Sequence, residues 1–136
     1  MHRIRTALLV ACALLAVGAT AAAARSTFFH TPSGQIYCVY HTGPTLLRCD
    51  TGYRTRFSGK KTCRHGDYGQ AFGMSPQGRA RALCVSDSTH AGRRVLRYGM
   101  KRHFGPFTCT SRRTGLTCSN KSGHGWFLSR ESQKLF

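Results

Sequence analysis

Two histidines in glycine-flanked turns are the side chains best suited to chemistry in this sequence. His65 lies in the run RHGDYG and His124 in the run GHGWFLSR, which ends at Arg130. An imidazole can act as a general acid or base, and an arginine can stabilise the negative charge of a phosphorane. The two histidines with neighbouring arginines would therefore suit a secreted ribonuclease-like phosphodiesterase. Their spacing does not bring them together, so His124, His65 and Arg130 are candidate functional residues and no residue is assigned as catalytic.

Other catalytic schemes lack the residues they need. A glycosidase needs two carboxylates beside its substrate, and Asp50, which follows Cys49 of a predicted hairpin, is more typical of a turn cap. The acidic residues of the chain are Asp50, Asp67, Asp87 and Glu131. The sequence contains no G-x-S-x-G motif, no C-x-x-C pair for zinc and no phosphate-binding glycine loop. We therefore expect no metal, no cofactor, and a binding protein rather than an enzyme.

A second class of function is binding to an anionic polymer, because the chain is strongly basic. It has 21 lysines and arginines and a formal net charge of +17. Basic residues are interleaved with aromatic ones in YRTRF (53–57) and RRVLRYGMKRHFG (93–105), where strand geometry would place Arg93, Val95 and Arg97 on one face. Such a face suits a wall polymer, a nucleic acid or an acidic glycan, and the alternative is an outer face that is only solvated. The candidate anion-binding residues are Arg93, Arg94, Arg97, Lys101, Arg102, Arg112 and Arg113.

A third class is a disulfide-rich module that presents rigid loops to a protein partner, as an inhibitor does. The runs GKKTCRHGDYG (59–69) and GHGW (123–126) would be such loops. The sequence does not separate this hypothesis from polymer binding.

The N-terminus has the layout of a secretory signal peptide. A basic start, MHRIR, precedes an apolar core, TALLVACALLAVGAT, and the small residues AAAAR. The core is too short to cross a bilayer, so we predict a signal peptide at 1–24. Cys12 allows a lipoprotein signal, but the apolar run continues past it, which disfavours modification there. The predicted product, 25–136, is a single secreted β domain, monomeric and without membrane insertion, located outside the cell or at the cell envelope.

Six cysteines remain after cleavage, and an even number in a small exported domain predicts a disulfide framework. The runs GQIYC and GPFTC end at Cys38 and Cys109, and the short returns LRC and LTC end at Cys49 and Cys118. Strand alternation places each cysteine on the same face as the apolar residue two positions before it. The predicted bridges are Cys38–Cys49 and Cys109–Cys118 in two similar hairpins, and Cys63–Cys84 by elimination.

The rest of the pattern predicts an all-β fold, a small antiparallel sheet domain held by these disulfides. The chain has 15 glycines and short alternating runs, with almost no helical periodicity. Further strands are expected at Arg79–Val85, Arg94–Gly99 and Gly125–Ser129. The tail from Arg130 is expected to form a helical turn or a last edge strand, and 58–78 to be rich in loops.

Several runs together resemble a known family. They are FHTPSGQIYCVY, LLRCD, VLRYG, GPFTCTSRRTGLTCSN and SGHGWFLSR. Over most of 25–136 the chain is similar to a family of small exported six-cysteine proteins of unassigned function from high-GC Gram-positive bacteria. The resemblance implies export and the six-cysteine framework, and it carries over no catalytic residue.

Overall fold

The protein is described by a computed structural model over residues 21–52 and 63–136. In these ranges the chain forms strands and connecting turns, and none of it forms a helix long and apolar enough to cross a membrane. Most of the predicted signal peptide and the YRTRF run lie outside the described residues. The strands are β1 (Ser26–His30), β2 (Ile36–Thr42), β3 (Thr45–Thr51), β4 (Asp67–Met74), β5 (Arg81–Val85), β6 (Lys101–Phe104), β7 (Phe107–Arg112), β8 (Gly115–Ser119), β9 (Gly125–Leu128) and β10 (Gln133–Leu135).

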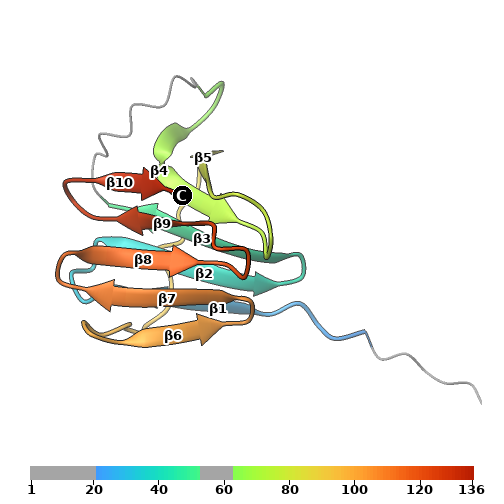
Figure 1. Cartoon of the computed structure of the whole chain (residues 1–136). Coiled ribbons are helices and arrows are strands. Elements are labelled where there is room, and N and C mark those ends of the chain that lie inside the picture. The colour runs from blue at the N-terminus through green and yellow to red at the C-terminus, as the bar shows by residue number, and fades with distance from the viewer. Residues whose placement is uncertain (1–20, 53–62) are drawn as a thin grey trace, which may run out of the picture.

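The strands form two five-stranded antiparallel sheets. The first has the order β1-β2-β3-β4-β5 and the second β10-β9-β8-β7-β6, so each is a meander of consecutive strands. Figure 1 shows the second sheet lying in front of the first. Apolar side chains from the inner faces of both sheets form one core, in which the rings of Phe29 and Phe104 stack at 4.2 Å. The predicted all-β fold is confirmed, as a two-layer sandwich.

All three predicted disulfides are present. Cys38 lies directly opposite Cys49 in the β2–β3 hairpin, and Cys109 lies directly opposite Cys118 in the β7–β8 hairpin. These four cysteines are fully buried, so both bridges are part of the core. The third bridge, Cys63–Cys84, joins the segment before β4 to β5.

The similarity between the hairpins extends to a third strand in each sheet. In the first sheet Cys49 is paired with Phe72 of β4. In the second sheet Cys118 is paired with Trp126 of β9. The units β2–β3–β4 and β7–β8–β9 therefore place a disulfide and a large ring in the same register. The sequence similarity between the two hairpins covers only the first two strands of this structural repeat.

Two local predictions are wrong. The sequence predicts that 58–78 is rich in loops; residues 58–62 lie outside the described residues, and Asp67–Met74 is the strand β4. Gly73 serves packing rather than a turn, since a Cβ on it would lie 2.8 Å from a methyl carbon of Leu83 on β5. Gly69 has a positive φ of 83° where the register between β4 and β5 shifts. Arg94–Gly99 was expected to be a strand, but only Val95 forms a bridge there, parallel to His30 of β1.

The segment 86–97, here called the strap, crosses the outer face of the first sheet. It leaves β5 and ends beside β1, where the amide of His30 donates to the carbonyl of Arg94 and the amide of Leu96 donates to the carbonyl of His30. Leu96 is buried, and the strap therefore protects the β1 edge from further pairing. No described segment covers the outer face of the second sheet, which faces the viewer in Figure 1.

Candidate anion-binding site

A cavity of about 330 Å³ opens at one end of the sandwich, where three turns meet. The turns join β1 to β2, β7 to β8 and β9 to β10, and all three lie on the left of Figure 1. Because strands of a meander alternate in direction, every second turn of a sheet must lie at the same end. The residues that line the cavity, here called the arginine pocket, are Thr31, Ser33, Ile36, Tyr98, Arg112, Arg113, Thr114, Gly115, Ser129, Arg130 and Glu131.

Three guanidinium groups dominate the charge of the arginine pocket. Arg112 ends β7, Arg113 follows it in the β7–β8 turn and Arg130 lies in the β9–β10 turn, and all three residues are exposed. The ion pairs found between described residues both belong to Arg48, so none of these arginines is held by a carboxylate. Glu131 supplies the single negative charge of the lining.

Neutral groups complete the pocket. The hydroxyl oxygens of Thr31 and Ser33 lie 3.0 Å apart, and Thr31 is buried. The guanidinium carbon of Arg113 lies 5.2 Å from the centroid of the Tyr98 ring, a cation–π contact that orients this arginine. The pocket therefore offers several guanidinium donors and a hydroxyl pair to an oxyanion of phosphate or carboxylate type.

The structure brings together some of the predicted cations and leaves others apart. Arg112 and Arg113, which are predicted to bind anions, line the same cavity as Arg130, which is predicted as a functional residue together with His124 and His65. Arg93 and Arg97 are exposed on the strap, and Lys101 is exposed on the edge strand β6. Arg94 and Arg102 line a separate small hollow beside Phe29 and Phe104. The predicted cationic sheet face at 93–97 does not exist, because this segment is not a strand.

Sequence reasoning found the arginines but missed their convergence. Tyr98, Thr31 and Ser33 of the pocket had no motif to mark them. A usable signal was present, since Arg112–Arg113 and Arg130 are separated by two predicted strands, Leu116–Cys118 and Gly125–Ser129, and consecutive antiparallel strands return every second turn to the same end of a sheet.

His65 and His124 lie at opposite ends of β4. His65 comes just before β4 begins. The turn that carries His124 is joined through Asn120 to the carbonyls of Ser75 and Gly78, just after β4 ends. A strand of this length spans about 23 Å, so the two imidazoles cannot act on one phosphodiester.

The GHG turn before β9 is built by Asn120, which is buried. The side-chain oxygen of Asn120 accepts hydrogen bonds from the amides of Ser122 and His124, at 3.0 and 3.1 Å. Gly123 has a positive φ of 80° and open space around it, whereas a Cβ on Gly125 would collide with the carbonyl of Cys118. Gly123 is therefore needed for a backbone conformation with positive φ, and Gly125 is needed because a side chain would not fit beside the carbonyl of Cys118.

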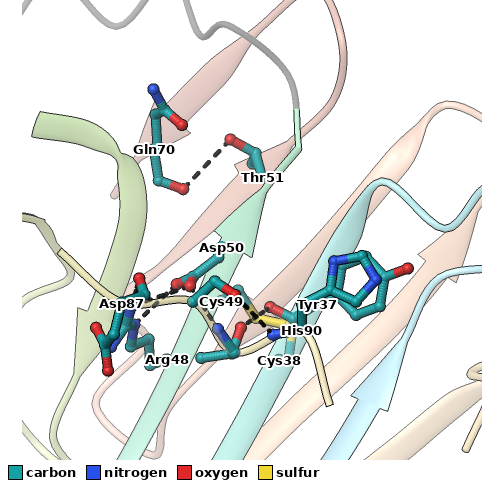
Figure 2. A network of polar contacts seen from close by, with 11 residues as sticks. Tyr37, Cys38, Arg48, Cys49, Asp50, Thr51, Gln70, Asp87 and His90 are labelled. Atoms are coloured by element: carbon teal, nitrogen blue, oxygen red, sulfur yellow. Dashed lines mark hydrogen bonds and ion pairs between the residues drawn. A yellow bond between two sulfur atoms is a disulfide. The ribbon is translucent and has the colours of Figure 1, made fainter. Parts of the chain in front are cut away.

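A polar network fastens the strap to β3 (Figure 2). The Nε of Arg48 donates to Asp50 at 2.8 Å, and its Nη1 donates to Asp87 of the strap at 3.0 Å. The amide of Thr89 donates to Asp50 at 2.9 Å, and the ring of His90 stacks on that of Tyr37 at 3.7 Å. Asp50 is therefore part of this network and not the turn cap that its position suggested.

Charge within the network shifts two pKa values. Burial lowers the pKa of Arg48, but hydrogen bonds and attraction from Asp50 and Asp87 outweigh it, so that this pKa is raised overall. A hydrogen bond from the Arg48 guanidinium, reinforced by its charge, holds the pKa of Asp87 below its usual range.

Three of the four acidic residues gather around a second, larger hollow of about 520 Å³. Asp50, Asp67 and Asp87 line it with Gln70 and backbone of the β5 end. Within residues 21–52 and 63–136, no group of three His, Cys, Asp or Glu side chains is arranged to bind a metal ion. Since Arg48 already engages Asp50 and Asp87, the hollow has no free pair of carboxylates for acid–base chemistry.

Comparison with known proteins gives one match. Residues 7–136 match a family described as "Family of unknown function (DUF6636)". Neither the curated proteins nor the solved structures give a match.

Proposed function

We propose that this chain, which belongs to the DUF6636 family of unknown function, is a secreted, strongly basic, non-enzymatic domain that binds an anionic polymer through the arginine pocket. The observation that carries the proposal is the meeting of Arg112, Arg113 and Arg130 in one cavity, where none of the three forms an ion pair with a carboxylate of residues 21–52 or 63–136. A guanidinium fork matches the geometry of phosphate and carboxylate oxygens, and clustered unpaired arginines repel one another until an anion binds.

The charge of the whole chain supports the same ligand class. A formal charge of +17 raises the local concentration of polyanions and speeds their association, with a strong dependence on salt. Arg93, Arg97 and Lys101 are exposed outside the pocket and would add attraction without a defined geometry. Binding is expected to combine a specific contact in the pocket with diffuse attraction around it.

The expected place of action supports a polymer of the cell exterior. The predicted signal peptide sends the chain out of the cell, and three disulfides are typical of an oxidising compartment. The resemblance to exported proteins of high-GC Gram-positive bacteria points to an envelope polymer or an extracellular one. Polymers of this kind carry phosphate or carboxylate groups, which are the groups that arginines bind best.

The proposal is tested with inorganic polyphosphate as the probe and the purified protein with its disulfides formed. The variant Arg112→Ala/Arg113→Ala/Arg130→Ala is expected to bind at least about tenfold more weakly by titration calorimetry. The matched control Arg79→Ala/Arg81→Ala/Lys121→Ala removes the same charge from exposed positions at the other end of the sandwich and is expected to weaken binding by less than about threefold.

Salt dependence separates the two contributions. Between about 50 and 300 mM salt the affinity of the unchanged protein should fall steeply, while the ratio between the two variants should persist at the higher salt. Equal weakening by both variants would mean that diffuse charge alone binds the probe. That result, or no binding at low salt, would overturn the proposal.

A further inference from the structure

The outer face of the second sheet presents cations and hydroxyl groups to solvent. Thr110 and Thr117 are paired in its middle strands, and Lys101 on β6 and Lys134 on β10 stand at its two edges in the same row. The side chains on this face are Lys101, His103, Thr108, Thr110, Arg112, Thr117, Ser119, Phe127 and Lys134. None of these is acidic, so the face is complementary in charge to an anionic chain.

One phenyl ring lies on this face. Phe127 points away from the core, since its neighbours Trp126 and Leu128 point into it and are fully buried. A Cβ on Gly115 would lie 2.7 Å from the Cε2 and Cζ atoms of Phe127. The Phe127 ring therefore rests on the backbone of Gly115 and is half-buried, in the same row as Thr110 and Thr117.

The face is continuous with the arginine pocket. Gly115, which supports the Phe127 ring, also lines the pocket. Its register partner on β7 is Arg112, which belongs to both surfaces. A ligand whose acidic group lies in the pocket would reach Phe127 and then the threonines as it extends over the sheet.

We infer that this face binds the sugar rings of an anionic glycan whose acidic groups bind in the arginine pocket, an inference that rests on the proposed function. A sugar ring has an apolar side that can pack against an aromatic ring and hydroxyl groups that exchange hydrogen bonds with Thr110 and Thr117. A single-stranded nucleic acid stacks successive bases on several aromatic side chains. The described residues of this face carry one phenyl ring, that of Phe127, and the imidazole of His103 lies apart from it at the β6 edge in another row. The two rings do not form a continuous stacking platform for successive bases, which favours sugar over bases.

A second copy of the chain does not fit this face as an occupant. Each copy carries a formal charge of +17, and the face itself has cations at both edges. Two such faces would repel each other at close range.

The test compares three probes on two variants by calorimetry. The probes are an oligogalacturonate, which has rings and acids, inorganic polyphosphate, which has acids alone, and an oligodeoxythymidine strand. Phe127→Ala is expected to weaken oligogalacturonate binding about five- to tenfold and to leave polyphosphate binding within about twofold. Phe127→Tyr, which keeps the ring, should bind oligogalacturonate as the unchanged protein does.

The outcomes separate this inference from the proposed function. If Phe127→Ala leaves the binding of both oligogalacturonate and polyphosphate unchanged, or weakens the two equally, the glycan inference fails. The proposed function would still stand where the pocket arginines govern polyphosphate binding. If the Phe127 ring matters for oligodeoxythymidine and not for oligogalacturonate, the face binds nucleic acid and the inference is overturned.

A second measurement does not depend on the folding of Phe127→Ala. Oligogalacturonate added to the unchanged protein should shift the amide resonances of Thr110, Thr117 and Phe127. The amides of Phe28 and Val39, on the face covered by the strap, serve as the control and should not shift. Shifts confined to the arginine pocket would contradict the inference.

Discussion

Phe72 and Trp126 occupy the same place in the two sheets, each beside the second cysteine of a cross-strand disulfide. Both rings are fully buried, as are the bridges next to them. Each half of the core is therefore built from one unit, a disulfide and a large ring in fixed register. Because the two buried bridges are sealed by these rings, they are far less accessible to a reductant than the third bridge, in which Cys84 is exposed.

The first prediction is a fixed order of reduction. With a mild thiol reductant and no denaturant, Cys63–Cys84 should be reduced at least about tenfold faster than the other two bridges, since thiol–disulfide exchange needs access to sulfur. Alkylation of the new thiols followed by mass spectrometry measures the order. In concentrated guanidinium chloride the three rates should become similar. Early reduction of Cys38–Cys49 in the folded protein would contradict the buried position of that bridge.

The second prediction concerns pH and the strap. Arg48 holds the pKa of Asp87 below its ordinary value of 3.8, so the ionised carboxylate favours the folded state. The stabilisation is complete above the ordinary pKa and is lost as the pH falls through the lower pKa of the folded protein. Asp87→Asn should therefore lower the urea midpoint at about pH 6, and the difference from the unchanged protein should shrink as the pH falls below the ordinary pKa of Asp87.

The size of this effect is expected to be small and sensitive to salt, because the Asp87 side chain is 76% exposed. Asp67→Asn is the matched control, since Asp67 lines the same hollow and forms no ion pair within the described residues. A difference between Asp87→Asn and the unchanged protein that persists at acid pH would show that the carboxylate charge is not the cause.

Local chemistry explains which parts of the fold were predictable. The two hairpins were predictable because alternation, a cysteine and turn residues all occur within a few positions of one another. Strand β4 was not, because Gly69 and Gly73 look like loop residues until the side chain of Leu83 is seen to pack over Gly73. The strap was not, because Leu96 alternates with its neighbours as strand residues do, although the segment makes only the single bridge between Val95 and His30 at the β1 edge.

Long-range convergence explains what was not predictable at the candidate site. Arg112 and Arg130 meet because two turns of one sheet lie at the same end, and Thr31 joins them only because the first sheet packs behind the second. The histidines illustrate the reverse case. His65 and His124 have similar local surroundings, yet the length of β4 separates them.

The third prediction tests whether the side chain of Asn120 stabilises the contact between the β8–β9 turn and the β4–β5 turn. Its side chain makes four hydrogen bonds, donating to the carbonyls of Ser75 and Gly78 and accepting from two amides of its own turn. Asn120→Ala should lower the free energy of unfolding by about 2–4 kcal/mol, because four hydrogen bonds of a buried side chain, which join the turns of the two sheets, would be lost together. Ser122→Ala is the control and should change it by less than about 0.5 kcal/mol. Equal effects of the two substitutions in urea unfolding would refute the role of Asn120.

The fourth prediction decides whether GHGW is a structural or a chemical motif. Gly125→Ala should lower the free energy of unfolding by about 3 kcal/mol or more, because its Cβ would collide with the carbonyl of Cys118. Gly123→Ala should cost about 1 kcal/mol, since its φ is positive but the space around it is open. His124→Ala should cost less than about 0.5 kcal/mol and leave polyphosphate binding within about twofold.

Urea unfolding and calorimetry measure this series on the same preparations. The order Gly125, Gly123, His124 follows from backbone geometry, since within the described part of the chain His124 forms its hydrogen bonds through its amide and carbonyl. If His124→Ala weakened polyphosphate binding as much as the pocket variant does, the imidazole would belong to a binding surface. The motif would then be functional, and the arginine pocket could not be the whole site.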